Sequence, residues 1–117
     1  MTPSARSLRS LRERGYYAQV VEQTIPHTFI KRDWGGWLDI IAAHPTLGIL
    51  GVQVSTSAHK GARLAKAREC PGLILWHLAG GKLAFHGWRK LRGRWVLEEV
   101  ELGMEHLIEE KPLEGGY

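Results

Sequence analysis

The spacing of apolar residues predicts two helices in this chain. Residues 3–14 place two leucines three positions apart, with a Thr-Pro helix start before them and Gly15 as a stop. A second stretch, 58–69, is rich in Ala, Leu, Lys and Arg, and Ser57 is well placed to cap it. The Pro-Gly pair at 71–72 is expected to end this second helix.

The other apolar segments lack helical spacing and predict strands. The segment 37–56 reads as two apolar runs joined by a His-Pro-Thr turn, which is typical of a buried hairpin. Asp39 stands in the first run, and Gln53 and Ser55 stand in the second; in a hairpin these polar side chains could line a metal site or satisfy one another. The predicted strands cover residues 16–25, 37–43, 48–55, 73–78, 83–91 and 94–102.

Length and composition predict one domain. The 117 residues place this domain at 1–102, followed by an acidic segment, 103–117, that adds one short helical turn. No apolar run approaches the ~20 residues of a membrane helix, and no signal peptide follows the Arg-rich start, so we expect a cytoplasmic protein without a membrane partner. The single cysteine, Cys70, excludes an internal disulfide.

Charge is divided unevenly along the chain. Residues 1–97 hold 15 Lys and Arg against 5 acidic residues, whereas 98–117 hold 7 Glu and one Lys. A basic body suits a polyanion such as DNA, although an ordinary solvated surface fits the charge equally well. Trp88 and Trp95 interleave with cations in the last hairpin, where they could stack on bases or pack in the core. The candidate DNA-binding residues are Arg6, Arg9, Arg12, Lys31, Arg32, Lys60, Arg63, Lys66, Arg89 and Lys90.

The predicted elements follow the order helix, strand, strand, strand, helix, strand and C-terminal hairpin. With this order, and with DIIAAHPTLGILGVQVS across the central hairpin, the chain resembles the PD-(D/E)XK nuclease superfamily. Asp39 stands at the family's Asp position, Gln53 at its acidic position and Ser55 at its Lys position. The chain is most similar to archaeal-type Holliday junction resolvases and small phage-encoded relatives with Gln-x-Ser or Gln-x-Thr on the third strand, over roughly residues 4–78.

This resemblance implies an α/β protein with a restriction-endonuclease-like core, in which helices flank a mixed sheet. It also implies a metal-dependent DNA endonuclease, with Mg²⁺ or Mn²⁺ as cofactor and branched DNA as substrate. A homodimer is expected because two strands must be cut symmetrically.

The family pattern implies that a metal is held by Asp39, Gln53 and the backbone carbonyl of Val54. Since Asp39 alone would give the site one formal negative charge, Glu22 or Asp33 is expected to join it for catalysis.

Ser55 cannot supply the ammonium group of the family's lysine, which orients water and neutralises developing charge. Lys31, Lys60 or Lys66 is expected to supply it from another backbone position. The alternative is a hydrogen-bonded remnant of the site, in a protein that binds DNA without cutting it.

Overall fold

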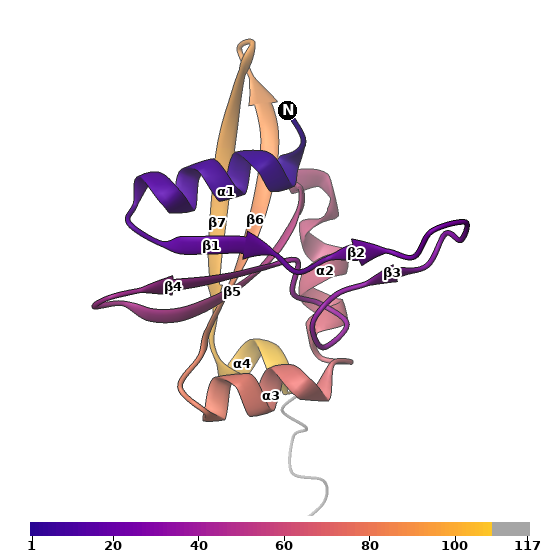
Figure 1. Ribbon diagram of the computed structural model, residues 1–117, viewed down its shortest axis with the longest axis vertical. Helices are drawn as coiled ribbons and strands as arrows, with labels where there is room; N and C mark the ends of the chain where they lie inside the picture. The colour runs from indigo at the N-terminus through magenta and orange to yellow at the C-terminus, as the bar shows by residue number, and fades with distance from the viewer. Residues whose placement is uncertain (109–117) are drawn as a thin grey trace, which may run out of the picture.

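A five-stranded sheet organises the chain, and helices cover both of its faces (Figure 1). The computed structural model describes residues 1–108; the rest of the acidic segment, 109–117, lies outside the described residues. The helices are α1 (Pro3–Glu13), α2 (Lys60–Ala67), α3 (Pro71–Leu78) and α4 (Met104–Leu107). The strands are β1 (Tyr17–Val20), β2 (Gln23–Thr24), β3 (Lys31–Arg32), β4 (Ile40–His44), β5 (Gly48–Thr56), β6 (Lys82–Leu91) and β7 (Arg94–Leu102).

The main sheet is mixed, as predicted. Its strand order is β1-β4-β5-β6-β7, and only β5 and β6 run parallel. The predicted central hairpin is confirmed as β4–β5, in which Ile40 pairs with Val52. The predicted last hairpin is confirmed as β6–β7, with Arg92 and Gly93 at φ values of 51° and 77° in its turn. Such a pair of positive φ values fits the twist of a two-residue hairpin loop.

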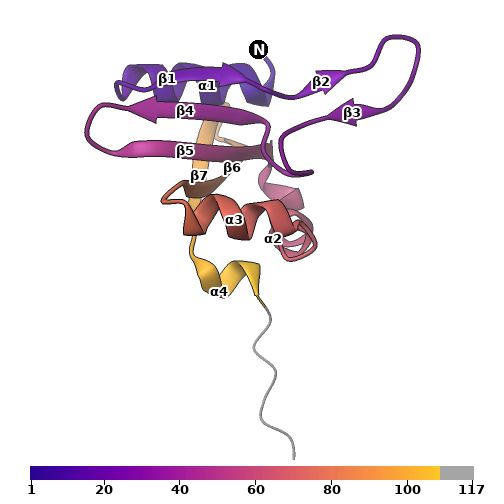
Figure 2. The ribbon, with the colours of Figure 1, turned by 60° about the horizontal axis from the view of Figure 1, so that its bottom comes forward.

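Figure 2 shows α1 on one face of the sheet and α2, α3 and α4 on the other. An apolar layer holds the helices against the sheet on each face. Side chains of successive strand residues point to opposite faces, so each strand contributes to both layers. On one face, Leu11 of α1 packs with Ile40 and Val52. On the other face, α2, α3 and α4 pack through Ala67, Leu73 and Leu107, together with apolar residues of the central strands.

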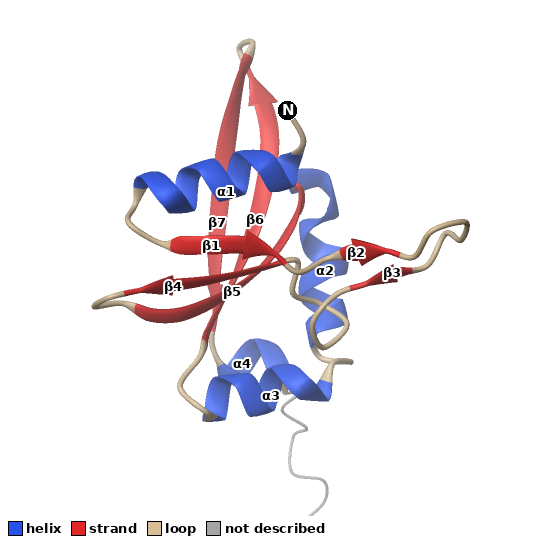
Figure 3. Cartoon of the chain, viewed as in Figure 1, coloured by secondary structure: helices blue, strands red, loops and turns tan. Residues whose placement is uncertain are grey.

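The segment predicted as a strand at 73–78 is wrong, because it forms α3 (Figure 3). A short continuous apolar run does not distinguish a buried strand from a buried helix. Pro71 stands in the first turn of α3, where its missing N–H costs no hydrogen bond, so the Pro-Gly pair begins a helix. Helical packing buries Leu73 completely and leaves Leu75 68% exposed.

The predicted first strand, 16–25, is divided into β1 and β2. Between them, the N–H groups of Val21 and Glu22 donate to the carbonyl of Asp39, at 2.8 and 3.2 Å. Beyond this point β2 leaves the main sheet and pairs with β3, so the two form a separate ribbon. Figure 1 shows this ribbon projecting from the side of the molecule.

The remaining boundaries differ in detail. The strand predicted at 37–43 begins later, at Ile40, because the preceding chain turns at an isolated bridge between Trp34 and Leu38. The second helix begins with a 3₁₀ turn, Ser57–His59, and Ser57 does not cap it. The predicted terminal turn is α4, and its Leu107 is buried. Within residues 1–108, no helix has the length and apolarity needed to cross a membrane.

Candidate active site

A polar cavity of about 190 Å³ lies beside the start of β4 and the end of β5. It brings together four of the five predicted catalytic residues and three of the predicted DNA-binding residues. Its walls come from the β2–β3 ribbon, the β4–β5 hairpin and α2. The lining residues are Glu22, Lys31, Asp33, Asp39, Gln53, Val54, Arg63 and Lys66.

Asp39 is fixed in this cavity by the backbone of β5. Its N–H donates to the carbonyl of Val52 at 2.8 Å, and its Oδ2 accepts from the N–H of Val54 at 2.8 Å. In an extended strand, the N–H and C=O of one residue leave by the same edge. The carbonyl of Val54 therefore faces the edge on which the carboxylate of Asp39 lies.

Three acidic side chains surround the cavity and influence one another. Burial, together with the charge and hydrogen bond of Glu22 and the charge of Asp33, raises the pKa of Asp39 to about 7. Burial also raises the pKa of Asp33, against the opposing charge of Lys66. A concentration of carboxylates that resist ionisation is a feature of functional sites, where a bound cation would relieve the repulsion.

Gln53 is buried and already hydrogen-bonded. Its Nε2 donates to the carbonyl of Trp37, so its Oε1 is the atom that could face a cation. The indole N–H of Trp37 donates to the carbonyl of Arg63 at 2.8 Å, which ties α2 to the segment before Asp39. This positioning role of Trp37 was not predicted; its place two residues before Asp39 was the only signal. Ser55 does not line the cavity.

The cations of the cavity differ in their partners. Lys31 Nζ lies 3.1 Å from Glu22. Arg63 Nε is buried and has no hydrogen-bond partner among the residues that the structure describes. Lys66 approaches closely enough to lower the pKa of Asp33, whereas Lys60 is paired with Glu98 on β7 and does not line the cavity. Of the three lysines expected to supply an ammonium group, Lys31 and Lys66 line the cavity and Lys60 does not.

The other predicted DNA-binding residues lie elsewhere. Three belong to α1, on the face of the sheet opposite α2. Of these, Arg6 stacks over Trp95 with 4.6 Å to the ring centroid, Arg9 pairs with Glu13, and Arg12 donates to the carbonyl of Ala18. The last three of the predicted DNA-binding residues are exposed: Arg32 on β3, and Arg89 and Lys90 on β6.

The donor set suits a hard divalent cation. Carboxylates, an amide oxygen and a backbone carbonyl are oxygen ligands, and Mg²⁺ is commonly held by one or two carboxylates with water and substrate phosphate. Within residues 1–108, no three His, Cys, Asp or Glu side chains are gathered as a metal cage. The arrangement therefore fits a site in which Asp39 and Glu22 are the charged ligands and water completes the coordination.

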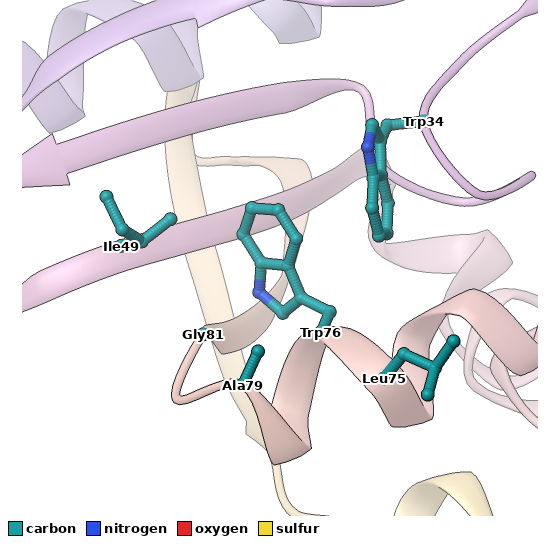
Figure 4. A pocket seen from close by; sticks show the side chains of 6 residues that line it. All are labelled: Trp34, Ile49, Leu75, Trp76, Ala79 and Gly81. Carbon is teal, nitrogen blue, oxygen red and sulfur yellow. The ribbon is translucent and has the colours of Figure 1, made fainter.

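A second hollow, of about 320 Å³, is apolar and has a different character (Figure 4). The Trp76 ring rises from α3 towards β5, and it meets Trp34 edge to face with 4.9 Å between the ring centroids. Among the residues that the structure describes, no carboxylate or cation lines this hollow, so it carries none of the chemistry of the polar cavity. Its lining residues are Trp34, Ile49, Leu75, Trp76, Ala79 and Gly81.

Comparison with protein-family models, curated proteins and solved structures gives no match for this chain.

Proposed function

We propose that this protein is a metal-dependent DNA endonuclease of the PD-(D/E)XK type, with a preference for branched DNA. The observation that carries the proposal is the polar cavity, in which three carboxylates face three cations. Hydrolysis of a phosphodiester needs both: carboxylates hold a cation that stabilises the developing charge, and basic groups bind the phosphate.

The order of elements supports the proposal. The sequence α1, β1, β4, β5, α2 and β6 follows the family order helix, strand, strand, strand, helix, strand. The last strand in this order is β6, which runs parallel to β5. The segment 73–78, which was expected to be that strand, forms α3. Asp39 immediately precedes the second strand of this series, β4, and Gln53 and Val54 lie on the third, β5.

Four residues of the cavity have assigned roles in this proposal. Asp39 and Glu22 would hold Mg²⁺ or Mn²⁺, which would supply positive charge to stabilise the negative charge on the phosphate being cleaved. The guanidinium of Arg63, which lines the cavity, binds a non-bridging phosphate oxygen. Lys66 takes the place of the family's lysine, where its ammonium group orients the attacking water. A homodimer would place two such cavities on the two strands to be cut.

Cleavage of labelled DNA tests the proposal. Wild-type protein should cut a four-way junction with Mg²⁺ or Mn²⁺, and Asp39→Ala should abolish cutting while keeping most of the binding measured in EDTA. Glu101→Gln, which removes an exposed carboxylate of β7 outside the cavity, is the matched control and should cut normally. Normal cleavage by Asp39→Ala would refute the assignment.

A second candidate is a DNA-binding module without catalysis. It is favoured by Gln53, a neutral side chain in the cavity at the position where the family has an acidic residue, and by the position of Ser55 outside the cavity. This candidate predicts salt-sensitive DNA binding and no cleavage with any divalent ion. A crystal soaked in Mn²⁺ should then show no ordered metal beside Asp39.

A further inference from the structure

The β2–β3 ribbon carries a fully exposed aromatic side chain at its tip. Phe29 is 106% exposed, and its neighbour Ile30 is 58% exposed. Burying a phenylalanine side chain is worth about 1.5–3 kcal/mol, so one held fully in water is a candidate anchor for a partner. Figure 1 shows this ribbon, with its tip at residues 25–30, extending away from the main sheet.

The tip is held in one shape by its own hydrogen bonds. Ile25 N–H donates to the carbonyl of Ile30 at 2.9 Å, and both the N–H and the hydroxyl of Thr28 donate to the carbonyl of Ile25. His27 completes the turn with a φ of 63°. Phe29 is therefore presented outward by an ordered loop, which reduces the entropy lost when a partner binds.

The base of the ribbon is part of the polar cavity. Glu22 precedes β2, Lys31 lies in β3 and Asp33 follows it, and all three line the cavity. The ribbon itself, residues 23–32, has two cations, Lys31 and Arg32, and no acidic residue. A molecule that reaches from the cavity to Phe29 therefore meets positive charge and then an apolar ring.

We infer that the β2–β3 ribbon inserts Phe29 into an unstacked step of the DNA whose phosphate occupies the cavity. This inference rests on the proposed function and adds to it the feature of the DNA that the protein recognises, which is the unstacked base step. Apolar side chains such as Phe and Ile wedge between bases where the stack is already weak, as it is at a branch. Lys31 and Arg32 bind the phosphates between the wedge and the cavity.

The length of the ribbon locates the wedge relative to the cut. The extended chain from Phe29 to Asp33 spans about 13 Å. A DNA strand rises ~3.4 Å per nucleotide, so the unstacked base lies about four nucleotides from the scissile phosphate. Junctions that expose an unpaired or poorly stacked base at this distance should be bound more tightly than linear duplexes.

Binding in EDTA to four-way junctions labelled with 2-aminopurine tests the inference without cleavage. The label is moved across the branch one position at a time, and its fluorescence rises where the base leaves the stack. Wild-type protein should give a rise at one position, and Phe29→Ala should lose it and bind the junction about ten-fold more weakly. Phe29→Trp should retain binding because the indole can also stack.

Leu75→Ala is the matched control, since Leu75 is an exposed apolar residue outside the ribbon. It should leave both the fluorescence rise and the affinity unchanged. An unchanged rise in Phe29→Ala would overturn the inference. Two other results for Phe29→Ala, each with junction binding intact, would also overturn it. A change from dimer to monomer in sedimentation would mean that Phe29 contacts a second copy. A loss of binding to anionic vesicles would mean that Phe29 contacts a lipid surface.

The failures of the two proposals are distinguishable. Asp39-dependent cleavage together with a normal fluorescence rise in Phe29→Ala would refute the wedge alone. A Phe29-dependent rise without cleavage in any divalent ion would refute the endonuclease and keep the wedge as the DNA-binding device of an inactive protein.

Discussion

At the scale of single residues, Asp39 joins function to stability. Its pKa is raised from 3.8 to about 7, first by burial and then by Glu22 and Asp33. The folded chain therefore holds a proton that the unfolded chain releases between these values, and stability falls as the pH rises through that window. The buried carboxylate of Asp39 therefore lowers the stability of the folded protein once it is ionised.

The first prediction follows from this sign. In EDTA at pH 8, Asp39→Asn should melt about 5 °C above wild type, because the amide removes the buried charge and still accepts from Val54. At pH 4, where Asp39 is protonated in the folded chain, the difference should shrink. Thermal melts by circular dichroism at both pH values measure this difference in melting temperature. An equal difference at pH 8 and pH 4 would contradict the buried charge of Asp39 as its cause.

The same variant separates a metal ligand from a merely buried acid. Adding Mg²⁺ at pH 8 should raise the melting temperature of wild-type protein, since a cation that binds only the folded state stabilises it. Asp39→Asn should respond little.

The second prediction concerns Arg63. Arg63 lines the cavity and its guanidinium is expected to bind phosphate, so Arg63→Ala should weaken junction binding in EDTA by about ten- to a hundred-fold. Arg63→Lys should recover only part of the loss, because lysine lacks the planar fork. Fluorescence anisotropy measures both, with the exposed Arg68→Ala as control. Equal losses in the Arg63 and Arg68 variants would mean that only net charge matters.

Sequence patterns predicted part of this site. Asp39, Gln53 and Val54 could be placed together because the register of a short hairpin follows from its turn. The approach of Lys66 could not, since it depends on how α2 lies on the sheet. Phe29 gave no signal, because exposure of one aromatic residue in a loop has no sequence pattern.

At the scale of elements, α3 shows where apolar pattern alone is insufficient. The run LILWHL is apolar at nearly every position, so neither a period of 2 nor one of 3.6 stands out. Its neighbours decided the outcome: Pro71 begins the helix, and β6 takes the place beside β5 that the run was expected to fill. Alternating or well-capped segments, such as α1 and the β6–β7 hairpin, were predicted correctly.

The third prediction uses the same helix. Residues 73 and 75 would share one face of a strand but diverge on a helix. Leu73→Ala should therefore lower the free energy of unfolding by about 2–5 kcal/mol, whereas Leu75→Ala should change it by less than about 0.5 kcal/mol. Urea denaturation measures both free energies of unfolding. Large and similar losses in the two variants would indicate that this segment is a strand.

At the scale of the whole molecule, a polar network joins the two ends of the chain. His86 on β6 is completely buried; its Nδ1 lies 2.9 Å from the hydroxyl of Ser7, and its Nε2 donates to Glu99 at 2.6 Å. Arg14 pairs with the same carboxylate at 2.9 Å. The first helix is thus held to the last two strands by hydrogen bonds as well as by apolar contacts.

The fourth prediction is a dependence of stability on acid. Hydrogen bonds from His86 and Arg14 lower the pKa of Glu99 to about 2, so its contribution is present above pH 4.5 and is lost as the pH falls towards 2. Glu99→Gln should lower the melting temperature at pH 6 and flatten its decline below pH 4.5. Thermal melts from pH 6 to pH 2 measure this, with Glu101→Gln as control. Parallel declines of the melting temperature in wild type and Glu99→Gln would contradict it.

The parallel pairing of β5 with β6 determines the order in which the chain can fold. The β4–β5 hairpin closes through a short turn, whereas β5 meets β6 only after α2 and α3 have crossed between them. Closing the longer loop is slower, so we expect the hairpin in the folding transition state and α3 outside it. In stopped-flow kinetics, Ala42→Gly should slow refolding, and Leu73→Ala should mainly speed unfolding. The carboxylate of Asp39 would then be in place before Arg63 and Lys66 arrive to face it.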